Sequence, residues 1–327
     1  MSFYLSEIVM AVSGRDVQYA KQLLCSEEVV VIPTETVYGL AGNALSPRAV
    51  AAIYEVKNRP SFNPLIIHTD RLEKVDEYVA SVPRAAQELA QAFWPGPLTM
   101  LLPKTDKLPD IVTAGSDRVA VRVPKHSLTL ALLGELDFPL AAPSANPFGY
   151  ISPTTVAHVE AQLGDKVAYI LDGGSCSVGI ESTIVGIEED KIEVYRWGGI
   201  SLEDLKTIIP NVQVYSSQIE DSPSAPGMLK SHYAPSKKVI IGNLGELLRQ
   251  YHHSEIGVIS FTDFFPQIPE NQQCVLSTSG DLNEAAQRLF SSLRYLDSSS
   301  IKVILAEFVP DYGLGRAIND RLARASA

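Results

Sequence analysis

The chain has 327 residues, of which 46% are hydrophobic and 20% charged, with a formal net charge of −11 at pH 7. This length suits two domains that each bury a hydrophobic core. The acidic excess argues against a broad nucleic-acid-binding surface, because neutralising many phosphates requires many lysines and arginines. Residues 1–210 hold most of the charge, since 17 basic and 26 acidic residues there give −9.

The first part of the chain alternates predicted helices and strands. Ser46 followed by Pro47 is typical of a helix start, and this helix extends to about Lys57. The other elements predicted here are a helix over 16–25, strands over 28–32 and 65–68, a helix over 85–93, strands over 98–102, 119–123 and 167–171, and a hairpin over 183–195. Because many connections are not helical, we predict a mixed-sheet α/β domain over 1–210.

The chain changes character after residue 210. Residues 211–237 are rich in Ser, Pro and Gly and lose apolar periodicity, which predicts a linker. The elements predicted beyond it are strands over 239–241, 256–260, 274–276 and 303–306 and helices over 244–251, 282–296 and 315–325. Their regular alternation predicts a smaller, Rossmann-like α/β domain over 238–327.

The cysteines and the hydropathy indicate the compartment. Cys25, Cys176 and Cys274 form no C-x-x-C pair, so neither a zinc site nor a disulfide framework is predicted, which suits a reducing cytoplasm. The first cation is Arg15, so the N-terminus lacks the basic segment of a signal peptide. No apolar run approaches the roughly 20 residues that span a bilayer. We therefore expect a cytoplasmic protein with no membrane partner.

The common catalytic and phosphate-binding motifs are missing from the sequence, but polar clusters follow several predicted elements. One is the segment 33–40, PTETVYGL, which suits a small polar ligand or equally an ordinary strand-to-loop turn. Another is Lys57 with Arg59 before Pro60. These cations could hold phosphates, or could simply occupy a helix end where the helix dipole favours positive charge.

Later clusters raise the same choice between a site and ordinary structure. Arg122 interrupts an apolar strand and needs an anionic partner, either a substrate carboxylate or an acidic side chain of the protein. The segments 143–146 (PSAN) and 181–183 (EST) read as ligand-contacting loops or as turns. Finally, Lys230, His232 and Tyr233 stand closer together than a linker requires, which indicates contact with another group.

Taken in order, five short motifs resemble those of the L-threonylcarbamoyladenylate synthases in their longer, two-domain form. They are Pro33–Leu40, Lys57-x-Arg59-Pro60, Pro143-Ser144-Ala145-Asn146, Glu181-Ser182-Thr183 and Ser231-His232-Tyr233-Ala234-Pro235. The resemblance covers essentially the whole chain and implies a YrdC-like twisted mixed-sheet α/β domain, a linker and a C-terminal domain. It implies a nucleotidyltransferase that forms L-threonylcarbamoyl-AMP and pyrophosphate from L-threonine, bicarbonate and ATP, the first step of threonylcarbamoyladenosine modification of tRNA.

The resemblance also implies roles for particular residues. Lys57 and Arg59 would be catalytic and hold the triphosphate. The other ATP-binding residues it implies are Asn63, Ser144, Asn146, Ser152, Arg196 and Tyr233, and the threonine-binding residues are Thr36, His68, Arg122 and Ser182. Mg²⁺ is expected with ATP, although no side chain can be singled out as its ligand. Downstream tRNA threonylcarbamoyl-transfer proteins would receive the product, and strong tRNA binding is not expected.

The linker motif suggests how the site closes. Because a carbamate is short-lived in water, we expect Pro226–Pro235 to fold over the site as a lid, with Tyr233 contacting the nucleotide or threonine. Two other functions occur with YrdC-like domains. A module that binds structured RNA is disfavoured by the charge of −9 over residues 1–210, and a carbamoyltransferase of hydrogenase maturation would need a zinc finger that three cysteines cannot build.

Overall fold

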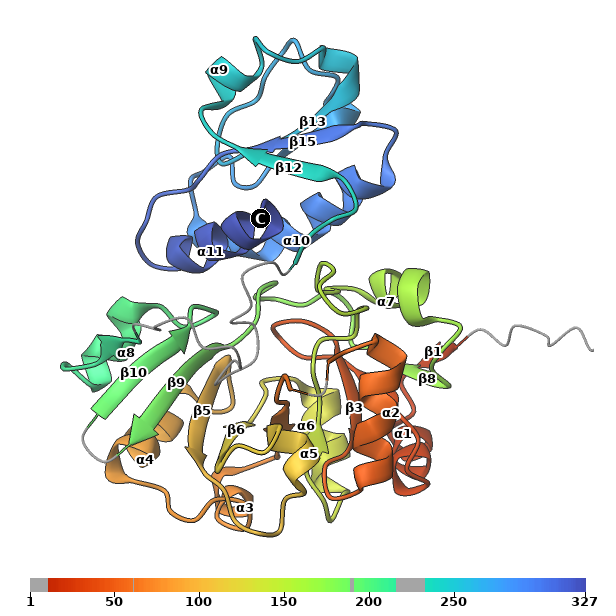
Figure 1. Cartoon of the computed structure of the whole chain (residues 1–327), viewed down its shortest axis with the longest axis vertical. Helices are drawn as coiled ribbons and strands as arrows, with labels where there is room; N and C mark the ends of the chain where they lie inside the picture. The colour runs from red at the N-terminus through yellow and green to blue at the C-terminus, as the bar shows by residue number, and fades with distance from the viewer. Residues whose placement is uncertain (1–10, 61, 189–190, 216–232) are drawn as a thin grey trace, which may run out of the picture.

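The computed structural model describes residues 11–60, 62–188, 191–215 and 233–327. These residues form a large domain with an eleven-stranded sheet and a smaller domain with a four-stranded sheet, stacked one on the other (Figure 1). The three cysteines, Cys25, Cys176 and Cys274, are free in the structure. None of the helices in the described ranges is long and apolar enough to cross a membrane.

The large sheet is mixed, as the sequence predicts. Its strands are β1 (Val12–Gly14), β2 (Val30–Ile32), β3 (Gly39–Asn43), β4 (Ile66–His68), β5 (Leu98–Pro103), β6 (Arg118–Arg122), β7 (Leu140–Ala141), β8 (Tyr169–Leu171), β9 (Thr183–Glu188), β10 (Lys191–Arg196) and β11 (Gln213–Val214). They lie in the order β1-β8-β2-β3-β7-β4-β6-β5-β9-β10-β11. The last strand falls in the predicted linker, so the sheet extends past residue 210; two exposed residues leave no apolar pattern to detect.

Eight helices of the described part of the large domain surround this sheet. They are α1 (Val17–Cys25), α2 (Pro47–Lys57), α3 (Leu72–Val75), α4 (Arg84–Phe93), α5 (Asp110–Thr113), α6 (Ser127–Gly134), α7 (Val156–Leu163) and α8 (Leu202–Ile208). Helix α2 begins as predicted, because the Ser46 hydroxyl accepts a hydrogen bond from the Ala49 amide at 3.2 Å. It ends where Asn58 adopts a left-handed conformation and the Arg59 amide donates to the Tyr54 carbonyl at 2.9 Å. This turn sets the direction in which Arg59 leaves the helix.

The smaller domain has a wholly parallel sheet, which confirms the Rossmann-like prediction. Its strands are β12 (Lys238–Ile241), β13 (Ile256–Ser260), β14 (Gln273–Val275) and β15 (Val303–Ala306), in the order β12-β15-β13-β14. Its α-helices are α9 (Leu244–Leu247), α10 (Leu282–Ser298) and α11 (Gly315–Ala325), with short 3-10 turns at His253–Glu255 and Glu270–Gln272. Helix α9 stops four residues before the predicted end at Tyr251, and Gly245 within it lowers its helical propensity.

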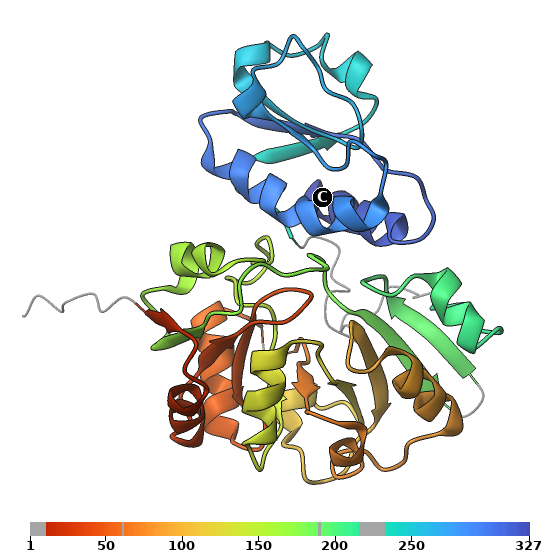
Figure 2. The ribbon, with the colours of Figure 1, turned by 180° about the vertical axis from the view of Figure 1, so that it is seen from behind.

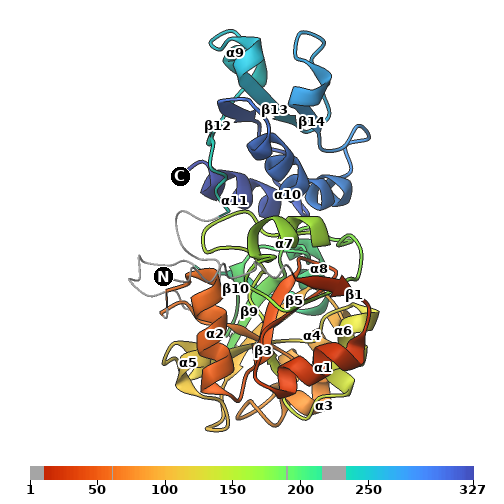
Figure 3. The same ribbon diagram turned by 90° about the vertical axis from the view of Figure 1, so that its right-hand side faces the viewer.

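Helices α10 and α11 form the face of the smaller domain that lies on the large domain, with the four-stranded sheet beyond them (Figures 1 and 3). The view from behind shows α10 running across the top of the large domain (Figure 2). The Arg294 guanidinium of α10 donates to the backbone carbonyls of Ile151 and Ser152, and Arg316 of α11 pairs with Glu203 at 2.8 Å. The domains therefore contact each other through specific polar interactions.

A glycine permits this close approach. Gly179 has a φ of +79°, and a Cβ at this position would lie 2.4 Å from the Cα atom of Gln287 in α10. Gly149 has a similar φ of +81°, but a Cβ there would meet nothing within 4 Å. The two positions therefore share the same backbone requirement and differ in the contact between domains.

This difference yields a prediction. Gly179→Ala should lower the free energy of unfolding by about 1–3 kcal/mol more than Gly149→Ala, because the added methyl group pushes α10 away from the large domain. Amide hydrogen exchange in α10 should rise in the Gly179 variant alone. Equal losses of stability and equal hydrogen exchange in the two variants would show that the close contact between Gly179 and α10 does not contribute to the free energy of unfolding.

Candidate functional site

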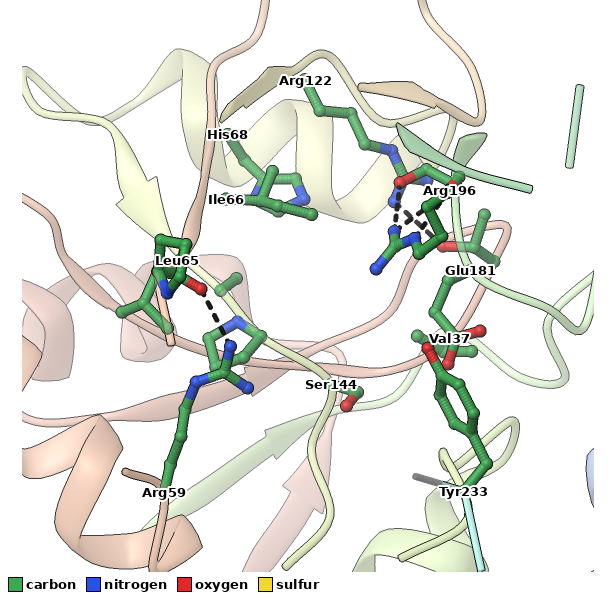
Figure 4. Close-up of a pocket in the computed structure, with 15 residues that line it drawn as sticks. Val37, Arg59, Leu65, Ile66, His68, Arg122, Ser144, Glu181, Arg196 and Tyr233 are labelled. Atoms are coloured by element: carbon green, nitrogen blue, oxygen red, sulfur yellow. Dashed lines mark hydrogen bonds between the residues drawn. The ribbon is translucent and has the colours of Figure 1, made fainter. Parts of the chain in front are cut away.

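One cavity of the large domain collects most of the residues to which the sequence assigns a role. Eight of those twelve residues line it: Thr36, Arg59, His68, Arg122, Ser144, Ser182, Arg196 and Tyr233. Figure 4 shows Arg59 entering from one side and Arg196 from the other. These residues come from segments spread over 198 positions of the chain, so only the folded sheet brings them together.

The sheet explains this convergence. Strands β4 and β6 are parallel neighbours, and their last residues, His68 and Arg122, lie opposite each other in the register. Ile66 and His68 point to the same face of β4 because side chains alternate along a strand, and both line the cavity. Ser182, directly before β9, and Arg196, the last residue of β10, line the far side.

Arg122 is held by three acceptors at one end of the cavity. Its Nη2 atom lies 2.8 Å from Glu35 Oε1, its Nη1 donates to the Thr36 hydroxyl at 3.0 Å, and its Nε donates to the Gly96 carbonyl at 3.2 Å. Arg122 and Glu35 are each 4% exposed. The anionic partner of Arg122, which the sequence left undecided, is therefore Glu35. The sequence signal that could have indicated this pairing is the position of Glu35 between two threonines of the 33–40 motif.

His68 faces the same end of the cavity. Its Nδ1 atom is buried and has no hydrogen-bond partner among the described residues. Burial, with a smaller contribution from the positive charge of Arg122, lowers the pKa of His68 to about 3. A neutral imidazole with an unused ring nitrogen can donate to or accept from a polar group of a small ligand.

Arg59 and Arg196 are each oriented by neighbouring acceptors. Arg59 donates to Asn63 Oδ1 at 2.7 Å and to the Pro64 carbonyl at 2.8 Å. Burial lowers the pKa of Arg59 to about 10, so the group stays charged at neutral pH. Arg196 donates to the Ser182 carbonyl at 2.9 Å and to its hydroxyl at 3.0 Å. Two oriented positive charges thus face the cavity, as recognition of an anion requires.

The remaining four predicted residues, Lys57, Asn63, Asn146 and Ser152, lie behind the cavity lining. The Lys57 ammonium is 1% exposed and donates to the backbone carbonyls of Ser144, at 2.5 Å, and of Asn146. The Asn146 side chain donates to two carbonyls of its own loop, and the Ser152 hydroxyl donates to Glu181 at 2.5 Å. In this structure Lys57 therefore fixes the 144–146 loop and does not itself line the cavity.

Tyr233 brings the linker into the site. It is 1% exposed, lines the cavity and stacks on Phe290 of α10 with ring centroids 5.6 Å apart. The expected lid also includes residues 226–232, which lie outside the described residues. The one aromatic residue of the lid motif that the structure describes is thus a wall of the cavity.

The cavity is suited to an anionic ligand and offers no built metal site. Among the described residues no group of three or more His, Cys, Asp and Glu side chains could hold a metal ion. The carboxylate in the lining, Glu181, is engaged by Arg321 of α11, whose Nε lies 3.0 Å from Glu181 Oε2. Neither Glu181 nor Arg321 received a role from the sequence, although Glu181 stands in one of its motifs.

Known proteins match most of this chain, in both of its domains. A family model described as "Telomere recombination" matches residues 22–198, and one described as "Threonylcarbamoyl-AMP synthase, C-terminal domain" matches residues 200–327. The chain is 38% identical to the threonylcarbamoyl-AMP synthase of Pyrococcus abyssi, covering 91% of this chain and 90% of the relative. It is 37% identical to that of Bacillus subtilis, covering 97% and 94%.

Solved structures extend the comparison to the fold. The crystal structure of P. abyssi Sua5 complexed with L-threonine matches with a TM-score of 0.88 and 37% identity, covering 97% of each chain. E. coli YciO matches 58% of this chain with a TM-score of 0.51 and 21% identity, which shows the fold of the large domain alone. Both domains, and their arrangement, are therefore shared with a solved two-domain structure.

The buried state of His68 leads to a prediction about pH. The unfolded chain protonates this histidine near its ordinary pKa of 6.5, whereas the folded chain resists protonation down to about pH 3, so acid favours unfolding across this window. The free energy of unfolding should fall from pH 7 to 5 by about 2 kcal/mol more in the unsubstituted chain than in His68→Gln. Urea denaturation at both pH values measures the difference.

A matched control uses an exposed histidine. His252 lies on the surface of the smaller domain. His252→Gln should retain the pH dependence of the unsubstituted chain. If His68→Gln retains it as well, His68 is not the group that resists protonation.

Proposed function

The chain belongs to the threonylcarbamoyl-AMP synthase family, and we propose that it makes L-threonylcarbamoyl-AMP and pyrophosphate from L-threonine, bicarbonate and ATP. The observation that carries the proposal is a single cavity with oriented arginines at its opposite ends, Arg122 at one and Arg59 at the other. A substrate carboxylate and a triphosphate are two anions that must bind side by side for this reaction. The cavity offers each of them a cationic group.

We place threonine at the Arg122 end. There Arg122 would pair with the substrate carboxylate, and the hydroxyls of Thr36 and Ser182 and the ring of His68 would contact its other polar groups. The P. abyssi structure that resembles this chain holds L-threonine, which supports threonine as the substrate. The ion pair with Glu35 fixes the Arg122 guanidinium in place before the substrate arrives.

The triphosphate of ATP would lie toward Arg59 and the 144–146 loop, and the nucleotide would extend to Arg196, which enters the cavity from the opposite side. The threonine amine attacks the carbon of bicarbonate, and loss of water leaves a carbamate. A carbamate oxygen then attacks the α-phosphorus, and the bond to the β-phosphate oxygen breaks so that pyrophosphate leaves with its electron pair. Negative charge accumulates on the phosphate oxygens, so oriented arginines and positioning supply the catalysis.

Lys57 would act on this site from behind. Its ammonium holds the carbonyls of Ser144 and Asn146, so its charge lies close to the loop that faces the phosphates. Mg²⁺ would enter as part of the Mg-ATP substrate, because the cavity carboxylate is occupied by an arginine. The protein's own contribution is therefore cationic and positional.

The fate of the product follows from its chemistry. A mixed carbonyl–phosphate anhydride reacts readily with nucleophiles, so we propose that it passes to tRNA threonylcarbamoyl-transfer proteins that modify the adenosine of tRNA. The charge of −9 over residues 1–210 favours this division of labour, because it opposes tight binding of tRNA by the synthase itself.

The reaction itself is the first test. Pyrophosphate release from Mg-ATP should require both L-threonine and bicarbonate. Arg59→Ala should lower kcat/KM by about 100-fold, because the variant loses a cation that stabilises developing charge. Arg84→Ala removes an arginine that is 91% exposed and should change nothing. Release without threonine, or an unchanged Arg59 variant, would contradict the proposal.

The second test separates the two ends of the cavity. Arg122→Lys keeps the charge but loses the two-pronged geometry, so the KM for threonine should rise about tenfold or more while the KM for ATP changes little. Threoninol, which lacks the carboxylate, should be a poor substrate for the unsubstituted chain. In Arg122→Lys the ratio of kcat/KM for threonine to kcat/KM for threoninol should be smaller than in the unsubstituted chain. A parallel rise of both KM values would place the carboxylate elsewhere.

A further inference from the structure

The smaller domain contributes a fully buried arginine beside the cavity. Arg321 of α11 is 0% exposed and contacts three parts of the large domain and the linker. Its Nε lies 3.0 Å from Glu181 Oε2, its Nη2 donates to the Trp197 carbonyl at 2.8 Å, and its guanidinium carbon lies 5.0 Å from the Tyr233 ring centroid. Glu181 and Tyr233 line the cavity, and Trp197 follows a third lining residue, Arg196.

The ion pair between Arg321 and Glu181 affects the charge of the cavity wall. The Glu181 carboxylate is 6% exposed in the wall of a cavity that we propose to hold a triphosphate. An unpaired carboxylate there would repel the nucleotide strongly, because little water remains to screen it. The second oxygen accepts from the Ser152 hydroxyl, which brings no positive charge. Among the described residues, Arg321 is the group that forms an ion pair with Glu181. Its Nη1 also pairs with Asp320 of the same helix at 2.7 Å, and Asp320 is paired with Arg324 as well.

The geometry also fixes Tyr233 on two sides. Phe290 of α10 stacks on its ring, and Arg321 of α11 lies over the ring. Both contacts come from the smaller domain, whose helices α10 and α11 face the large domain (Figure 1). Tyr233, which forms one wall of the cavity, is thus held in place by residues of the smaller domain.

We propose that Arg321 is a positioning residue for the nucleotide half of the site, and that the smaller domain is in this way a working part of the catalytic centre. Arg321 neutralises Glu181 and holds Tyr233 against the cavity, so that nucleotide phosphates can bind. This inference rests on the proposed function, since it presumes that the anion in the cavity is ATP.

The experiment is a double-mutant cycle in the full chain. Arg321→Met should raise the KM for ATP roughly tenfold or more, with a smaller effect on the KM for threonine, because it leaves Glu181 charged and unpaired. Glu181→Gln removes that charge. The double variant Arg321→Met with Glu181→Gln should therefore bind ATP better than Arg321→Met alone.

If Arg321 served packing alone, the opposite result would be expected, and the free energy of unfolding of each variant shows whether any rescue acts on stability and not on ATP binding. Loss of packing would not be repaired by a second substitution, so the two losses would add and the double variant would be the weakest. Arg316→Met is the matched control, because Arg316 lies on the same helix and pairs with Glu203 across the same interface without touching the cavity lining. It should leave both KM values unchanged, and a tenfold rise there would mean that any interface pair has this effect.

Two readouts separate failure of this inference from failure of the proposed function. Turnover is followed by pyrophosphate release, and nucleotide binding is followed directly by titration with a non-hydrolysable ATP analogue. If the unsubstituted chain binds the analogue but shows no threonine-dependent release, the proposed reaction is wrong, while the binding cycle still tests Arg321. If turnover is normal and Arg321→Met binds the analogue as tightly as the unsubstituted chain, the role of Arg321 is wrong. Should Arg321→Met not fold, the same comparison is made with Arg321→Gln, which removes the charge but keeps hydrogen-bond donors for Glu181 and the Trp197 carbonyl.

Discussion

Burial of positive charge organises this structure. Lys57, Arg122, Arg196 and Arg321 are all more than nine-tenths buried around one cavity, and removing a cation from water is costly unless acceptors replace the water. Lys57 donates to loop carbonyls and Arg196 to Ser182. Arg122 pairs with Glu35, and Arg321 pairs with Glu181 and Asp320. Because these acceptors come from distant segments, the need to satisfy the cations draws the loops of the cavity into place.

The ion pair between Arg321 and Glu181 extends this constraint to the domain arrangement. Breaking a buried pair by removing one partner destabilises a protein far more than breaking a surface pair, so the two domains are held at the position where the pair forms. Gly179 makes the required approach of α10 possible because it has no side chain. Docking of the smaller domain and completion of the cavity are therefore the same structural event.

The acidic surface of the chain and the arginines of its cavity favour different ligands. A net charge of −11 opposes nonspecific binding of polyanions, whereas the cavity concentrates arginines where a small anion can reach them. Glu35 pairs with Arg122 of the cavity, and Glu181 pairs with Arg321 behind the lining, while Arg59 and Arg196 donate to uncharged acceptors. The positive character of the cavity thus survives in a protein that is negative elsewhere, which fits an enzyme that binds a nucleotide and leaves RNA to another protein.

The sequence by itself determined the elements and the motif residues, because helix caps, apolar periodicity and short motifs depend on neighbours along the chain. Ser46 and Pro47 predicted the start of α2, and the alternation after residue 238 predicted the parallel sheet. It could not show which acid pairs with Arg122, that Lys57 points into a loop, or that Arg321 differs from Arg316 on the same helix. Only the tertiary structure decided these, because an ion pair depends on distance in space and on burial, and local sequence encodes neither.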